Sequence, residues 1–177
     1  MFGFKSLAIA TLVVAGASLA LPAVASERSY FKSVAGSWAG PGSIVAGKYK
    51  GTRFFCNFTG TSPVAKTGMK VDGSCRVGVF SQPMSIEINK VGRSYRGKFL
   101  DGAKGKGLDI VSGRLRGKKL VVGINRKKLN GAMVANMNNK NQMHITISVK
   151  VRRKLIPVIG LTLSRKAGVM KTSLVVD

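Results

Sequence analysis

Acidic side chains are nearly absent from this chain of 177 residues. Six Asp and Glu stand against 30 Lys and Arg, which gives a formal net charge of +24 at pH 7. Ordinary protein surfaces intersperse charges of both signs. Here the excess of one sign creates a strong positive field that attracts anions. So few carboxylates also leave little material for glycosidase-type acid pairs or for oxygen-rich metal sites.

Histidine and cysteine are almost as scarce. His144 is the only histidine and lies on the polar face of an alternating segment, so we interpret it as a surface residue. Asp101 and Asp109 flank a Gly- and Lys-rich turn, and we interpret them as partners in ion pairs. The one His and few acids leave too few ligands for a metal site at the cysteines. We therefore expect no catalytic residue, no metal and no cofactor, and we expect that the protein is not an enzyme.

The two cysteines, Cys56 and Cys75, are expected to form a disulfide if the chain reaches an oxidising compartment. A closed loop of this length, about 20 residues, contributes roughly 3 kcal/mol in the chain-entropy model.

Long apolar runs are missing except near the N-terminus. Lys5 precedes an apolar stretch over residues 7–21, and Ala23-Val24-Ala25 fits the small-x-small cleavage pattern of a secretory signal peptide. The stretch is short for a membrane span, which needs about 20 apolar residues. We predict a signal peptide over residues 1–25, with an uncleaved anchor as the alternative, and a single domain over residues 26–177. The protein is then exported, to the periplasm or beyond the cell.

Helical periodicity is weak, and its best candidate is a short segment over residues 27–34. Alternation with a period of two is strong instead. In residues 143–151, apolar side chains alternate with polar ones, which indicates a strand with one buried face. Similar segments, separated by short turns, continue to residue 163, and Pro157 indicates an edge or a bulge in the last of them. We predict an all-β fold, an antiparallel up-and-down barrel of about eight or nine strands.

Gly36-Ser37-Trp38 opens the first expected strand. This resembles the Gly-x-Trp signature of lipocalins, and the whole layout resembles small secreted lipocalin-like barrels of the alphaproteobacterial envelope. The resemblance implies that Gly36 and Trp38 lie at the barrel floor and that an Arg stacks on the Trp, for which Arg165 is the candidate. It also implies an interior that could hold a small apolar ligand. Residues 167–177 lack the amphipathic pattern of the C-terminal helix that lipocalins usually carry.

Basic residues gather in the expected turns. The run of residues 102–107 lacks the Ser or Thr and the following helix of a phosphate-binding loop, so it is either a flexible hairpin tip or a cationic loop. A solvated basic face that keeps the protein soluble is the alternative to a binding surface. We assign anion binding to the clustered cations Lys104, Lys106, Arg126, Lys127, Lys128, Arg152, Arg153 and Lys154.

Export and the basic excess together predict a non-catalytic barrel that docks on anionic envelope surfaces, either phospholipid or lipopolysaccharide. A lipocalin-like carrier of a small apolar ligand is the alternative, and a secreted hydrolase is disfavoured. Nucleic acid is a poor candidate partner because export removes the genome as a target, and because aromatic residues are few and Phe54, Phe58, Tyr95 and Phe99 are expected to face inward, away from stacking positions. The sequence favours no particular oligomeric state.

Overall fold

One helix and ten strands make up the protein. The computed structural model describes residues 23–100 and 107–167. The elements, in chain order, are α1 (Ala23–Val34), β1 (Gly36–Ile44), β2 (Arg53–Thr61), β3 (Gly68–Val77), β4 (Phe80–Val91), β5 (Ser94–Leu100), β6 (Leu108–Arg116), β7 (Lys119–Arg126), β8 (Leu129–Asn139), β9 (Gln142–Val151) and β10 (Lys154–Arg165).

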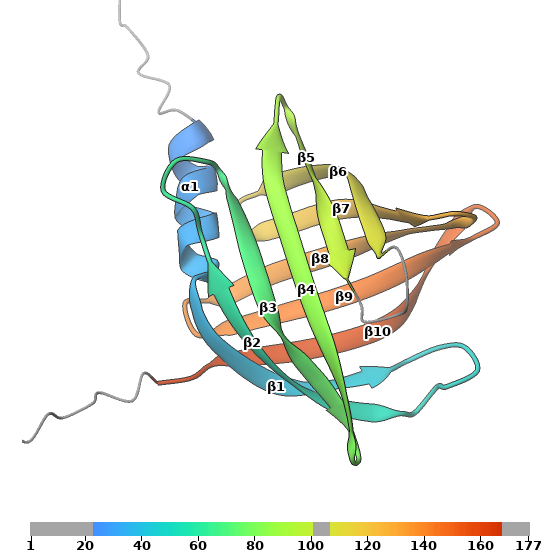
Figure 1. Cartoon of the computed structure of the whole chain (residues 1–177). Helices are drawn as coiled ribbons and strands as arrows, with labels where there is room; N and C mark the ends of the chain where they lie inside the picture. The colour runs from blue at the N-terminus through green and yellow to red at the C-terminus, as the bar shows by residue number, and fades with distance from the viewer. Residues whose placement is uncertain (1–22, 101–106, 168–177) are drawn as a thin grey trace, which may run out of the picture.

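The ten strands form a closed antiparallel barrel (Figure 1). Each strand pairs with its neighbours in the chain, and β1 closes the barrel by pairing with β10. The predicted up-and-down barrel is confirmed, but the count of eight or nine strands is wrong. β3 and β4 are joined by only two residues, Gly78 and Val79. Val79 continues the alternation of Cys75 and Val77, so the sequence pattern runs through this turn without a visible break.

Alternation along the strands fills the barrel from within. In β7, for example, Leu120, Val122 and Ile124 are buried inside the barrel. Phe58, Tyr95 and Phe99 also face inward, as predicted. Pro157 lies at a bulge, where the register between β9 and β10 shifts. A bulge accommodates a residue that has no N–H to donate to the ladder.

The predicted disulfide between Cys56 and Cys75 is confirmed. The two residues lie directly opposite each other on β2 and β3, with a Cα–Cα distance of 4.0 Å. Cys56 is buried, and Cys75 lines the barrel interior. The bond therefore staples two neighbouring strands on the inner side of the wall.

Helix α1 lies across one end of the barrel, at the upper left of Figure 1. Tyr30, Phe31 and Val34 share one helical face and are buried. The Phe31 ring packs edge-on against the ring of Tyr95, with centroids 5.4 Å apart, and the Tyr30 hydroxyl donates to the carbonyl oxygen of Ala135 at 3.2 Å. Burial raises the pKa of both phenols, so both stay protonated at neutral pH. The helix thus plugs this end with side chains.

The plug begins earlier than expected, because α1 starts at Ala23 rather than near Glu27. Most of the predicted signal peptide, residues 1–22, lies outside the described residues, as does most of the tail over residues 167–177. The buried plug side chains all follow Ala25, so cleavage there would leave them in place. Within the described ranges, no helix has the length and apolar character needed to cross a membrane.

Arg165 connects the plug to the barrel closure. Its guanidinium stacks on the Trp38 ring, 4.3 Å from the ring centroid, as the lipocalin resemblance implies. The same group donates to the carbonyl oxygens of Ala35 and Ser33, both at 2.6 Å, and to that of Lys140 at 2.9 Å. The indole N–H of Trp38 donates to the carbonyl oxygen of Val34 at 2.8 Å. The donors to Ser33, Val34 and Ala35 satisfy carbonyls at the end of α1, which have no partners within the helix.

Gly36 explains the first position of the signature. Its φ of 116° lies in a region that side-chain-bearing residues rarely adopt. A Cβ atom at this position would lie 2.6 Å from a guanidinium nitrogen of Arg165. The glycine therefore turns the chain sharply from α1 into β1 and leaves room for the arginine.

We predict that Arg165→Met lowers the free energy of unfolding by about 3 kcal/mol, because it leaves two part-buried carbonyls and one exposed carbonyl without a charged donor and removes the stack on Trp38. Urea unfolding followed by circular dichroism measures the change. Arg116→Met, on the exposed barrel surface, is the control and should change stability by less than about 0.5 kcal/mol. Equal effects of the two substitutions would contradict the role given to Arg165.

Candidate anion-binding and ligand-binding sites at the open end

The end of the barrel opposite α1 carries the turns that follow the odd-numbered strands. We call it the open end; its described turns span residues 45–52, 78–79, 127–128 and 152–153. The other end, with α1 and the turns after β2, β4, β6 and β8, is the plugged end. In Figure 1 the open end faces the lower right. Among the described residues, the open-end turns contain no acidic side chain.

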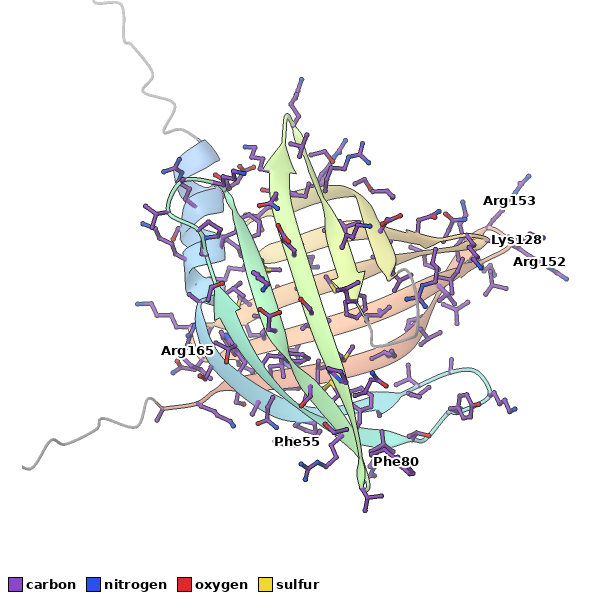
Figure 2. All side chains as sticks on the ribbon, in the orientation of Figure 1. Phe55, Phe80, Lys128, Arg152, Arg153 and Arg165 are labelled. Carbon is purple, nitrogen blue, oxygen red and sulfur yellow. A yellow bond between two sulfur atoms is a disulfide. The ribbon has the colours of Figure 1, made fainter. Side chains whose placement is uncertain are left out.

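Two of the predicted basic clusters come together at this end. Gly131 in β8 lies opposite Val149 in β9, which places the β7–β8 turn beside the β9–β10 turn. Figure 2 shows Lys128, Arg152 and Arg153 extending together from these two turns. Five of the predicted anion-binding residues therefore form one surface, the hairpin cluster: Lys127, Lys128, Arg152, Arg153 and Lys154. Arg126, in contrast, is half-buried and lies on the face of β7 that carries the buried Leu120, Val122 and Ile124. The other two, Lys104 and Lys106, lie outside the described residues.

The two turns of the hairpin cluster have an unusual backbone. Each is a two-residue turn whose first residue has a positive φ, 51° at Lys127 and 53° at Arg152. The other turns with a positive φ at this position have glycine there, namely Gly78, Gly92 and Gly117. A left-handed conformation costs a non-glycine residue roughly 1–2 kcal/mol. Non-glycine residues in such strained conformations cluster at functional sites.

Acidic residues neutralise little of the positive surface. The three ion pairs among the described residues are Lys70–Asp72, Lys90–Glu27 and Lys98–Asp109. The last agrees with the interpretation of Asp109 as an ion-pair partner, whereas Asp101 lies outside the described residues. A hydrogen bond from Ser85 lowers the pKa of Asp72, and Lys70 contributes a smaller effect in the same direction. These three pairs do not involve Lys127, Lys128, Arg152, Arg153 or Lys154.

An apolar cavity of about 230 Å³ lies inside the barrel. It extends from the buried Val34 and Trp38 at the plugged end toward Ile44, Val77 and Gln82, which are partly or fully exposed. The cavity is therefore closed by the plug and reaches solvent at the open end. Every strand except β6 and β7 contributes to the lining: Val34, Trp38, Ile44, Phe54, Phe58, Met69, Val71, Cys75, Val77, Gln82, Met84, Ile86, Phe99, Met133, Ala135, Met143, Ile145, Ile147, Ile159, Leu161 and Leu163.

The lining suits an apolar ligand. Gln82 is its only residue with a polar side chain among those of the described chain. An engineered apolar cavity of about 150 Å³ stays dry and binds benzene. A larger cavity of the same chemistry can hold a small apolar molecule or part of a longer one.

Large apolar side chains are exposed at the open end, and the sequence analysis did not identify them. Val79 and Phe80, at the β3–β4 turn, are 90% and 79% exposed. Phe55 lies on the outer face near Phe80 (Figure 2). Val79 has the spacing of a residue on the inward face of Cys75, but it lies at the tip of a hairpin and is exposed. The alternation of apolar residues does not reveal the turn; only the structure shows that Gly78 adopts a positive φ and ends the strand before Val79.

A second basic surface was also missed. Arg93, Arg114, Arg116 and Lys119 line a shallow groove on the outer wall near the plugged end, together with Ser94 and Ser112. Ser112, Arg114 and Arg116 share one face of β6, but alternation from the buried Leu108 and Ile110 would place them inward. A register shift between Ile110 and Ser112 turns them outward, which the sequence pattern does not reveal. This groove is the main alternative to the hairpin cluster as a site for anions.

His144 lies on the outer face of the barrel, as predicted. Its Nδ1 atom lies 2.9 Å from the hydroxyl oxygen of Thr162 on the neighbouring strand. Within the described residues, no group of three or more His, Cys, Asp or Glu side chains is arranged to hold a metal ion.

Comparison with known proteins supports the fold of the chain but identifies no family. No family model matches the chain, and no curated protein matches it. The crystal structure of Rv2717c from M. tuberculosis is similar, with a TM-score of 0.56 and 12% sequence identity over 80% of this chain and 98% of that chain. At this identity the similarity supports the barrel fold alone. The resemblance to alphaproteobacterial envelope barrels stays a prediction.

We predict that Lys127→Gly raises the free energy of unfolding by about 0.5–1 kcal/mol, because glycine adopts the positive φ without steric cost. The matched control is Gly117→Lys, at the equivalent position of a plugged-end turn. A Cβ there meets nothing within 4 Å, so only the backbone conformation is penalised. This substitution should lower stability by about 1 kcal/mol. Urea unfolding measures both, and changes of the same sign would contradict the interpretation.

Proposed function

We propose that this protein is a non-catalytic, exported barrel that docks on anionic surfaces of the cell envelope, either phospholipid head groups or lipopolysaccharide phosphates. The observation that carries the proposal is the hairpin cluster, in which two neighbouring turns and the residue that follows the second of them place five cations together at one end of the barrel. Phosphate groups are the common anions of both surfaces. Cations near an anionic membrane contribute about 1 kcal/mol each at physiological ionic strength.

The strained backbone of two turns also supports binding at the open end. Lys127 and Arg152 occupy positions at which glycine is favoured. The protein therefore keeps charged residues at two turn tips despite a cost in stability. A requirement for charge at these tips accounts for that choice, whereas a general need for solubility could be met at any unstrained surface position.

Vesicle co-sedimentation tests the proposal. We expect binding to vesicles that contain phosphatidylglycerol or lipopolysaccharide and little binding to neutral phosphatidylcholine vesicles. Binding should weaken as salt rises, because salt screens exposed charges. A protein that binds neutral and anionic vesicles equally, or neither, does not have this function. Single-stranded DNA that binds more tightly than the vesicles would instead favour nucleic acid as the partner.

Two matched triple variants identify the docking surface. We predict that Arg152→Ser, Arg153→Ser and Lys154→Ser together weaken binding to anionic vesicles by about 100-fold, at roughly 1 kcal/mol for each cation. The control removes the same charge from the outer groove, through Arg114→Ser, Arg116→Ser and Lys119→Ser, and should weaken binding much less. If the control has the larger effect, the outer groove and not the hairpin cluster binds the anion.

The cavity favours a second candidate function, a carrier of a small apolar ligand. Its support is the apolar lining that reaches the open end. We predict that the protein binds a fluorescent apolar probe such as N-phenyl-1-naphthylamine and that Ile147→Trp, which fills the cavity, abolishes this binding. Val121→Trp, on the exposed outer wall, is the control and should leave it unchanged. Absence of probe binding by the unmodified protein, or its persistence in the Ile147→Trp variant, would exclude the cavity as the site.

A further inference from the structure

Positive charge alone does not single out one end of the barrel. Cations also surround the plugged end, where Arg93, Arg114, Arg116 and Lys119 line the outer groove. Exposed apolar side chains, in contrast, are concentrated at the open end. Near the plugged end, the large apolar side chains exposed among the described residues of turns and strand ends are Val64 and Val91.

The apolar side chains of the open end lie on several neighbouring turns. Val79 and Phe80 occupy the β3–β4 turn, Tyr49 lies in the β1–β2 turn, and Leu129, Val151 and Leu155 flank the turns of the hairpin cluster. A single exposed apolar residue needs no explanation, but a group that encircles one end indicates an interaction site. We call these six side chains the apolar rim.

The apolar rim and the hairpin cluster are interleaved. Leu129 follows Lys128 directly, and Val151 and Leu155 lie on either side of Arg152, Arg153 and Lys154. Figure 2 shows the cationic turns on the right and Phe80 at the bottom, on the two sides of the lower-right end. The same end therefore offers apolar groups for a hydrocarbon layer and cations for the charges that border it.

We propose that the open end inserts the apolar rim into an anionic phospholipid bilayer, while the cations of the hairpin cluster contact the lipid phosphates. This inference rests on the proposed docking function and adds to it the orientation of the barrel, the insertion of side chains below the head groups, and phospholipid as the partner. The protein then sits with its cavity toward the membrane and with α1 on the far side.

A bilayer fits this surface better than a second copy of the chain. Two open ends facing each other would bring their hairpin clusters together, and the described turns supply no acidic residue to neutralise them. An anionic membrane presents negative charge and hydrocarbon within a few ångströms of each other. This layered chemistry matches cationic side chains that stand beside apolar ones.

The orientation also gives the cavity a direct connection to the hydrocarbon layer. Ile44, Val77 and Ile159 line the cavity on its open side, and the rim surrounds that opening. An acyl chain could thus pass between the membrane and the cavity without crossing water. The plug at the opposite end prevents passage through the barrel.

Tryptophan fluorescence with membrane-borne quenchers tests the insertion. Val79→Trp places a reporter in the apolar rim, and Val64→Trp places a matched reporter on a plugged-end turn; the original side chains are 90% and 91% exposed. The only natural tryptophan, Trp38, is buried at the plugged end and supplies a constant background. The vesicles contain phosphatidylglycerol and phosphatidylcholine with a nitroxide on the acyl chain.

We predict that the Val79→Trp signal shifts to the blue and is quenched on these vesicles, whereas the Val64→Trp signal stays like that in buffer. Unmodified protein that does not bind the vesicles overturns both the docking function and this inference. Binding without acyl-chain quenching at position 79, or with equal quenching at position 64, leaves docking intact and overturns the insertion. A concentration-dependent blue shift of Val79→Trp without vesicles would show that a second copy covers the rim.

A second measurement separates the contribution of apolar insertion to vesicle binding from the contribution of charge. Val79→Ser with Phe80→Ser removes apolar area and keeps every cation, so binding at high salt should weaken by about tenfold or more, as expected for two large apolar side chains. Val64→Ser with Val91→Ser is the matched control at the plugged end and should leave binding unchanged. Unaltered binding of the rim variant at high salt would overturn the insertion.

Discussion

The guanidinium of Arg165 holds together the parts of the chain that are furthest apart in sequence. Arg165 ends β10 and lies opposite Trp38, so it stands where the last strand closes onto the first. Through its hydrogen bonds to Ser33 and Ala35, it also fixes the end of α1 over the barrel. One side chain therefore contributes both to barrel closure and to the placement of the plug. Its planar fork can stack on an indole and bond several carbonyls at once, which a lysine cannot do.

Because α1 closes one end of the barrel, the other end is available for the binding proposed above. The plugged end is filled with buried aromatic side chains, and the disulfide joins β2 and β3 on the inner side of the wall. Stability is supplied by these regions. The open end can then retain strained turns at Lys127 and Arg152, exposed apolar tips and an unfilled cavity. Such features lower stability locally, and the protein tolerates them because they are remote from the contacts that close the barrel.

The sequence was sufficient to predict features that depend on the pattern of one segment, or for which the chain offers few alternatives. Alternation over residues 143–151 identified a strand, two cysteines left one disulfide, and the Gly-x-Trp motif led to Arg165. Features set by turn register were not predictable in the same way. Val79 has the spacing of an inward residue, yet a two-residue turn places it at the tip of a hairpin. The joining of two basic clusters into one surface likewise depends on the pairing of β8 with β9, which single-segment patterns do not contain.

The net charge of +24 also explains how the protein can expose apolar side chains at one end. Apolar patches promote association, but two molecules of high like charge repel each other in solution. Closure of the barrel removes another route to aggregation, because none of the ten described strands has a free edge. An anionic surface neutralises the same charges that keep copies of the chain apart. The charge would therefore protect the apolar rim in solution and, in the proposed docking, bring it to an anionic membrane.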